Sequence, residues 1–279
     1  NLPEENIAYF LQKHSPKLKE WQREILRIVR VLAQYFYPQR QTKVMNEGCA
    51  TFVHYEIFNR MYDKGLLTPG SMMEFAHMHS AVIAQQSYKS KYYSGFNPYA
   101  LGFAMMQDIK RICLDPTEED KEWFPHFAGN PDYMSVLKDC WKNYRDESFI
   151  LQFLSPKVMR DFRMFNLRTS HSEDNYHVKN IQDEEGYKNI RRSLAASYDI
   201  ANYDPDIQIT SADLDGSRRL EITHIIHNGT TLAEADRDLV IRNIANLWGY
   251  RTRLKEVSKT GYTVRDVEQL PQVGVFDKA

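Results

Sequence analysis

The chain has 279 residues, of which 36 are Lys or Arg and 37 are Asp or Glu, so its formal net charge is −1. A balance this even gives no electrostatic case for binding nucleic acid or an anionic membrane surface. No apolar stretch reaches the ~20 residues that a membrane span needs, and the length allows one large domain or two ordinary ones.

The first part of the chain, up to about Leu167, has apolar residues at the helical period of 3.6 residues. Prolines punctuate it, and several follow a capping residue, as in Asn97-Pro98 and Ser155-Pro156. Helices are predicted over about 21–37, 44–62, 71–85, 98–113, 117 onward and 156–165. This part should therefore be an all-α domain.

The second part, from about His171, changes to the short alternating stretches that are typical of strands. Asp215-Gly216 is a hairpin signal between two of them. Strands are predicted over 176–181, 207–210, 220–225, 251–257 and 262–267, and helices over 184–198 and 234–248. We therefore predict an α+β protein, with an α-helical domain over 1–168 and a small α+β domain, for which a ferredoxin-like fold is one option, over 169–279.

Glu47 is the one residue expected to be charged at neutral pH in the helix-compatible run 44–55. Burying an unpaired carboxylate is costly, so Glu47 should be largely buried with a specific polar partner. It could bind a metal ion, or it could accept hydrogen bonds from a buried Arg, Tyr or helix N-terminus. His54 lies two turns further on, about 10 Å along the helix axis, which is far for two ligands of one ion.

A second group of polar residues lies in the next predicted helix. Glu74 and His77 have the Glu-x-x-His spacing that di-iron bundles use in two copies, and one copy is found. His79 shares a face with Phe75, so it should point inward, either as a hydrogen-bonded core residue or as a ligand. With Glu47, these residues raise the case for a shared polar centre. The candidate metal ligands are Glu47, His54, Glu74, His77 and His79.

The segment from Tyr88 to Tyr99 is rich in tyrosine around Gly95. It could form a lid over a ligand, present a surface to a partner, or fold back to seal the helical core. The three cysteines, Cys49, Cys113 and Cys140, have no CxxC spacing, which predicts reduced, buried thiols in a cytoplasmic protein.

Five blocks between about Asn6 and Trp248 resemble a known family. They are 20–30, 35–39, 45–48, 93–103 and 146–158, and they include Met45-Asn46-Glu47-Gly48. These blocks are similar to the SpoVR family, the stage V sporulation protein R-like proteins of bacteria. The resemblance implies that the sequence is the C-terminal portion of a longer protein with a histidine-rich upstream half. Cys49 and Val53 stand where the family block has tryptophan.

The resemblance implies a link to spore cortex formation, to stationary-phase stress and to a PrkA-type serine kinase as a partner. It leaves the biochemical activity open, so two functions are carried forward. The first is a regulatory protein that binds partners. The second is part of a gluzincin-like metallohydrolase, because Asn-Glu-Gly-x-Ala also resembles the third-ligand helix of those enzymes. In that case Glu47 would bind a divalent metal such as zinc, with the other ligands in the upstream half, since no HExxH occurs in this chain.

Overall fold

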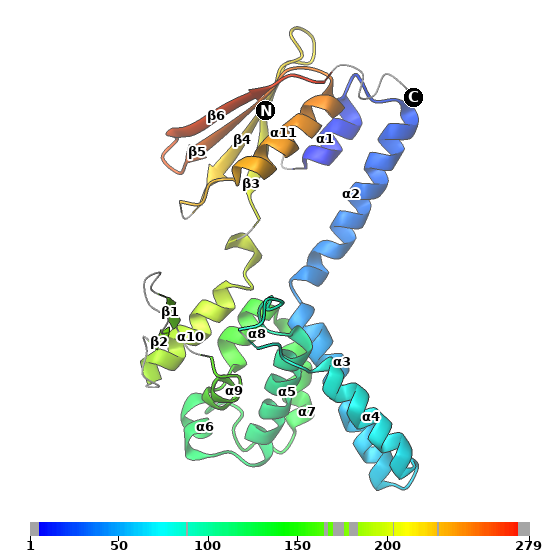
Figure 1. Cartoon of the computed structure of the whole chain (residues 1–279), viewed down its shortest axis with the longest axis vertical. Helices are drawn as coiled ribbons and strands as arrows, with labels where there is room; N and C mark the ends of the chain where they lie inside the picture. The colour runs from blue at the N-terminus through cyan, green and yellow to red at the C-terminus, as the bar shows by residue number, and fades with distance from the viewer. Residues whose placement is uncertain are drawn as a thin grey trace. The chain divides into compact units, whose positions relative to one another are not determined.

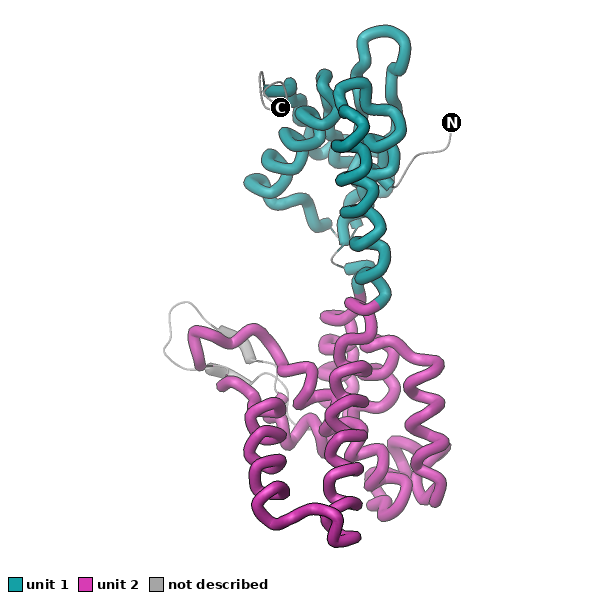
Figure 2. The backbone as a smooth tube through the Cα atoms, turned by 90° about the vertical axis from the view of Figure 1, so that its right-hand side faces the viewer, with its two compact units in different colours: residues 1–38, 200–279 teal, residues 39–199 magenta. Residues whose placement is uncertain are grey.

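The computed structural model describes residues 6–87, 89–164, 167–169, 176–178, 184–202, 204–227 and 229–272, with side chains outside 165–183. Its contacts divide the chain into two compact units, a helical unit of residues 39–199 and a sheet unit of residues 1–38 and 200–279 (Figure 2). One unit is built of helices and the other of a sheet with helices, so the predicted α+β fold class is confirmed. Among the described helices, none has the length and apolarity to cross a membrane.

The helical unit is built around α5. Its elements are α3 (Lys43–Asp63), α4 (Pro69–Val82), α5 (Pro98–Leu114), α6 (Glu118–Trp123), α7 (Tyr133–Asn143), α8 (Asp146–Phe153), α9 (Pro156–Asp161), β1 (Leu167–Thr169), β2 (Tyr176–Val178) and α10 (Glu184–Ala196). Leu101, Met105 and Ile109 of α5 are fully buried, and Phe52 of α3 and Phe149 of α8 lie in the same core. Burial of these large side chains is the main stabilising contribution to this unit.

The predicted caps begin the helices at the expected places. Asn97 accepts a hydrogen bond from the backbone N–H of Tyr99 at 3.0 Å, and Ser155 accepts one from Val158 at 3.1 Å. In both helices a proline occupies the first turn, where its missing N–H costs nothing. Local chemistry therefore determines where these helices start.

A crossing of two glycines brings α3 and α5 together. A Cβ added to Gly48 would lie 2.5 Å from the Cα of Gly102, and one added to Gly102 would lie 2.3 Å from the carbonyl oxygen of Val44. Neither position has room for a side chain, so the two helix backbones are in direct contact. The glycine of the Asn-Glu-Gly block is therefore a packing residue.

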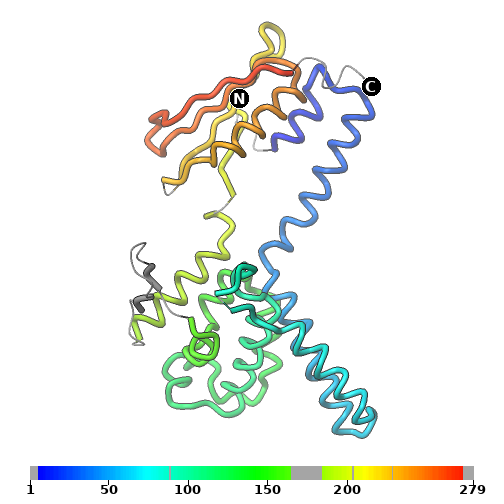
Figure 3. Tube along the Cα trace, viewed as in Figure 1, coloured from blue at the N-terminus to red at the C-terminus, as the bar shows by residue number. Residues whose placement is uncertain are grey.

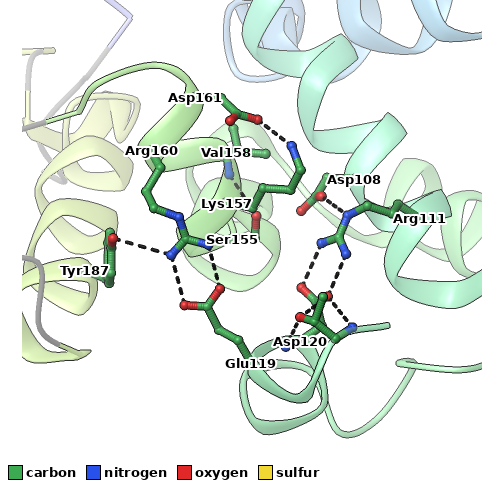
Figure 4. Close-up of polar contacts among 11 residues, drawn as sticks. Asp108, Arg111, Glu119, Asp120, Ser155, Lys157, Val158, Arg160, Asp161 and Tyr187 are labelled. Atoms are coloured by element: carbon green, nitrogen blue, oxygen red, sulfur yellow. Dashed lines mark hydrogen bonds and ion pairs between the residues drawn. The ribbon is translucent and has the colours of Figure 1, made fainter. Parts of the chain in front are cut away.

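Two ion-pair groups link α5, α6, α9 and α10 (Figure 4). The guanidinium of Arg111 binds both oxygens of Asp120 at 2.6 and 2.8 Å, and its Nε donates to Asp108 at 2.7 Å. Asp108 and Asp120 are 5% and 3% exposed. Arg160 of α9 binds Glu119 at 2.7 and 2.9 Å and reaches the hydroxyl of Tyr187 on α10 at 3.5 Å.

The sheet unit has one four-stranded sheet (Figures 1 and 3). Its elements are α1 (Ile7–His14), the greater part of α2 (Glu20–Arg40), a 3₁₀ turn (Ile200–Asn202), β3 (Asp206–Ala212), β4 (Leu220–Ile226), α11 (Glu234–Trp248), β5 (Thr252–Ser258) and β6 (Thr263–Gln269). The strands lie in chain order, with β4 parallel to β5 through α11 and antiparallel pairs on either side. Leu220 and Ile222 of β4 are buried in one core with Trp248 of α11 and Leu11 of α1.

The ferredoxin-like option is not what the sheet adopts. That fold separates its parallel strands by a strand between them, whereas β4 and β5 are direct neighbours. The predicted strand 176–181 is observed as β2, which pairs with β1 outside this sheet, and residues 179–181 lie outside the described part. The predicted helix 184–198 packs on α8 as α10, where the guanidinium of Arg191 donates to the carbonyl of Leu154 at 2.9 Å.

The units defined by contacts have other bounds than the predicted domains 1–168 and 169–279. Residues up to Pro38 group with the sheet, and residues up to Asp199 group with the helices. The sheet unit thus combines the two ends of the described chain. Helical periodicity over 21–37 gave no signal of this grouping, because it reports secondary structure and not the surface on which a helix packs.

Candidate functional site

Glu47 lies half-buried in α3. The Glu47 carboxylate interacts with Tyr99 at the start of α5. Hydrogen bonding to Glu47, with burial and the negative charge of Glu47, raises the pKa of Tyr99 above its usual value. The carboxylate is therefore less buried than predicted, and its specific polar partner stays a prediction.

His54 and His79 meet in an aromatic cluster between α3, α4 and α5. Both rings contact Phe75, at centroid distances of 5.2 and 5.4 Å, and His79 also contacts Phe103 edge-on at 4.8 Å. Burial, and secondly the neighbouring His54, lower the pKa of His79, so its ring is neutral at pH 7. Its Nε2 is buried and has no hydrogen-bond partner among the described residues. The inward phase predicted for His79 is thus observed, with aromatic rings as its neighbours.

The other two candidates, Glu74 and His77, are exposed on α4. Within the described residues, no three His, Cys, Asp or Glu side chains are grouped closely enough to hold a metal ion. The candidates Glu47, His54, Glu74, His77 and His79 therefore do not form a complete metal site by themselves. A catalytic zinc needs three protein ligands and an open position, and the chain does not bring three together here.

The α3–α4 hairpin carries all five candidates. Its two helices run side by side (Figure 1), and α3 also packs on α5. Large apolar side chains on the hairpin remain in contact with solvent, and two of them are methionines. We call this set the hairpin surface: Ile57, Tyr62, Leu66, Met73, Met78 and Val82, all between 41% and 75% exposed.

A cleft of about 690 Å³ lies elsewhere in the helical unit, beside the tyrosine-rich segment. Tyr93 and Ser94 line it together with Lys43 of α3 and Tyr198 beyond α10. Gln85 holds the segment in place, because its Oε1 accepts the N–H of Asn97 at 2.7 Å and its Nε2 donates to Gly95 at 3.2 Å. Burial, and secondly the charge of Asp146, raise the pKa of Tyr198 to about 12, so its hydroxyl stays protonated.

Of the roles predicted for the tyrosine-rich segment, packing against the helical core is observed for Phe96, and the roles as a lid or a partner surface stay predictions. Tyr93 faces the cleft, whereas Phe96 packs against the helical core and lies 5.9 Å from the ring of Phe162. Tyr88 lies outside the described residues.

Asp146 was not recognised as a site residue from the sequence. It is 1% exposed, and its carboxylate accepts the N–H groups of Val44 and Met45 at 2.9 Å, at the first turn of α3. Burial raises its pKa to about 6 against the opposing effect of these hydrogen bonds. The available signal was its place in the block 146–158, although nothing local to that block points to α3.

A buried His–Glu pair in the sheet unit was also missed. His224 of β4 and Glu256 of β5 are register partners, 4% and 1% exposed, with Nδ1 and Oε2 3.2 Å apart. Glu256 also accepts the N–H of Leu232 at 2.9 Å and lies 3.9 Å from the guanidinium of Arg237. The alternation of β4 and β5 places both side chains on the core-facing side, which is the signal that would have found them.

Comparison with known proteins agrees with the sequence blocks. Residues 1–203 match the family model described as "SpoVR like protein", and residues 205–259 match the "SpoVR-like C-terminal domain". The chain is 49% identical over 269 residues to "Uncharacterized protein YcgB" of Escherichia coli (strain K12), covering 96% of this chain and 52% of that protein. It thus spans about half the length of this curated relative, and no solved structure gives a significant match. On these matches, the chain belongs to the SpoVR family.

Proposed function

We propose that the chain is part of a cytoplasmic regulatory protein that acts by binding protein partners through the α3–α4 hairpin. The observation that supports this is the hairpin surface, because one helix pair leaves six large apolar side chains exposed to water, where a partner could cover them. Met73 and Met78 add flexible, polarisable contacts of the kind used at adaptable binding surfaces.

The family resemblance suggests the setting in which the hairpin works. Family members are linked to spore cortex formation and to stationary-phase stress, and a PrkA-type serine kinase is the partner that the resemblance implies. A kinase partner requires no catalytic group on this chain. The proposal is therefore compatible with a hairpin whose polar residues, Glu74 and His77, are exposed and whose inner histidines lie among aromatic rings.

Replacing both Met73 and Met78 by glutamate should weaken partner binding by about tenfold or more, because two charges would have to be desolvated in an apolar interface. The melting temperature should hardly change, since both side chains are exposed. Binding of the purified PrkA-type kinase from the same bacterium is measured by biolayer interferometry beside a thermal melt. Leu114→Glu is the matched control, because Leu114 is about as exposed as Met78 but lies at the end of α5. Kinase binding that survives the double substitution would contradict the hairpin proposal.

The alternative function is that of a metallohydrolase for which Glu47 supplies one ligand. One observation favours keeping it: Glu47 is half-buried, and the side chain that interacts with it is the neutral Tyr99 rather than a cation. A carboxylate held this way keeps acceptor capacity for a further partner. The other ligands would have to come from chain outside this sequence, since the candidates here do not converge.

In that case Glu47→Gln should lower the metal content of the full-length family protein while its melting temperature stays within a few degrees. Glutamine keeps the shape and the hydrogen bond to Tyr99 but removes the charge that binds a cation. Elemental analysis of both proteins, beside thermal melts, makes the comparison, with the exposed Glu74→Gln as the control. For the 279-residue chain alone we expect no metal or a weak, incomplete site. Equal metal content in the full-length wild type and variant, or none in either, would rule out this role.

A further inference from the structure

One face of α2 is strongly apolar and exposed. Its side chains include the aromatic Trp21 near the start of the helix and Tyr35 and Phe36 near its end. We call this set the α2 apolar face: Trp21, Ile25, Ile28, Val29, Val31, Leu32, Tyr35 and Phe36, each between 44% and 65% exposed. At 1.5 Å per residue the set extends over about 22 Å of helix. A patch of this kind in water is too large to be an ordinary surface.

The sheet unit holds α2 by the opposite side of the helix. The guanidinium of Arg23 donates to the carbonyls of Gln12 and Ser15, and the guanidinium of Arg30 lies 5.3 Å from the ring of Tyr9. Leu26 packs against the core of the sheet unit. At 100° per residue, these three positions lie about 180° from the middle of the apolar face. The unit that anchors α2 therefore turns the apolar face away from itself.

The width of the apolar face indicates whether a single helix or a groove between several elements covers it. Its eight residues span an arc of about 160° around the helix, whereas a two-stranded coiled coil buries only a narrow seam of alternating positions. A second copy of α2 paired along Ile25, Ile28 and Leu32 would leave Val29 and Val31, at the two edges of the arc, in water. An arc this wide is typical of a helix embedded in a groove between several elements.

The longer relative has further chain that can cover this face. The chain aligns with 52% of that relative, so the relative has nearly as much chain again outside the aligned part. We propose that the α2 apolar face docks into an apolar groove formed by this additional part of the full-length family proteins. This docking involves α2 alone and does not use the hairpin surface, which lies on α3 and α4.

Cysteine labelling tests this proposal in two proteins. Ile28→Cys lies in the apolar face, and the matched control Gln34→Cys lies on the opposite, polar side of the same exposed stretch. The same pair is made at the aligned positions of full-length E. coli YcgB. Maleimide labelling is followed by mass spectrometry at peptide level, which separates the new thiols from Cys49, and each rate is divided by the rate in the unfolded protein.

In the 279-residue chain the two positions should label at similar rates. In the full-length relative, the position aligned with Ile28 should label about tenfold or more slowly than the control, because the docked surface must open first. Equal rates in the full-length relative would overturn the proposal. Slow labelling of Ile28→Cys in the 279-residue chain would also overturn it. Light scattering would then show the cause: a dimer would mean that a second copy covers the face, and a monomer that the chain's own residues cover it.

Amide hydrogen exchange gives the same comparison without a substitution. An uncovered helix frays, so the segment after Leu26 should exchange quickly in the 279-residue chain and slowly in the full-length relative. Fast exchange of the aligned segment in both proteins would contradict the docking, even if the cysteine variants failed to fold.

Discussion

Replacing Arg111 by methionine should lower the free energy of unfolding by about 3 kcal/mol or more. Methionine keeps the length of the side chain but leaves the carboxylates of Asp108 and Asp120 buried without their cation. Asp108 already has one carboxylate oxygen without a hydrogen-bond partner among the described residues, so it cannot compensate. Urea denaturation followed by circular dichroism measures the loss.

The double variant Arg111→Met/Asp120→Asn is the control for this prediction. Removing the charge of Asp120 together with the guanidinium should restore part of the loss, because an uncompensated buried charge is the main cost. A double variant no more stable than Arg111→Met would show that packing rather than charge is responsible.

Arg111→Met should also change how the free energy of unfolding depends on pH. Burial opposes the ionisation of Asp120, but hydrogen bonds from Arg111 and Thr117 outweigh it and lower its pKa to about 2, from 3.8. The folded state therefore holds fewer protons than the unfolded state, and this group contributes about 2 kcal/mol above pH 4 that is lost as the pH falls towards 2. In Arg111→Met, the decline in stability between pH 4 and pH 2 should be shallower.

Local features of the fold could be predicted from the sequence, and the grouping of its elements could not. The starts of α5 and α9 follow from Asn97 and Ser155, whose capping chemistry is confined to a few residues. The position of α10 depends on Arg191 reaching the carbonyl of Leu154, across 37 residues of chain. Contacts at this separation have no signature in the periodicity of either segment.

For the candidate site, too, the sequence predicted local features but not the contacts between helices. The uncharged helical run around Glu47 predicted a largely buried carboxylate, but Glu47 is half-buried, and Tyr99, which interacts with it, comes from another helix. The phase of His79 was enough to place it inward, and the rings around it come from three helices. Glu74 and His77 have a spacing used by metal sites, yet they are exposed, because spacing along a helix does not show which side of the helix is covered.

Gly102→Ala should destabilise the protein by about 2 kcal/mol or more, although alanine is the better helix former by about 1 kcal/mol. The added Cβ would lie 2.3 Å from the carbonyl oxygen of Val44 and 2.7 Å from the Cα of Gly48, so α3 and α5 must move apart. Gly70→Ala is the matched control, because the nearest atom to its Cβ is 3.9 Å away and its stability should be unchanged or slightly raised. Equal midpoints of urea unfolding for the two variants would show that α3 and α5 can move apart at the glycine crossing without loss of stability. The close approach of these helices would then not be needed to place Glu47 beside Tyr99.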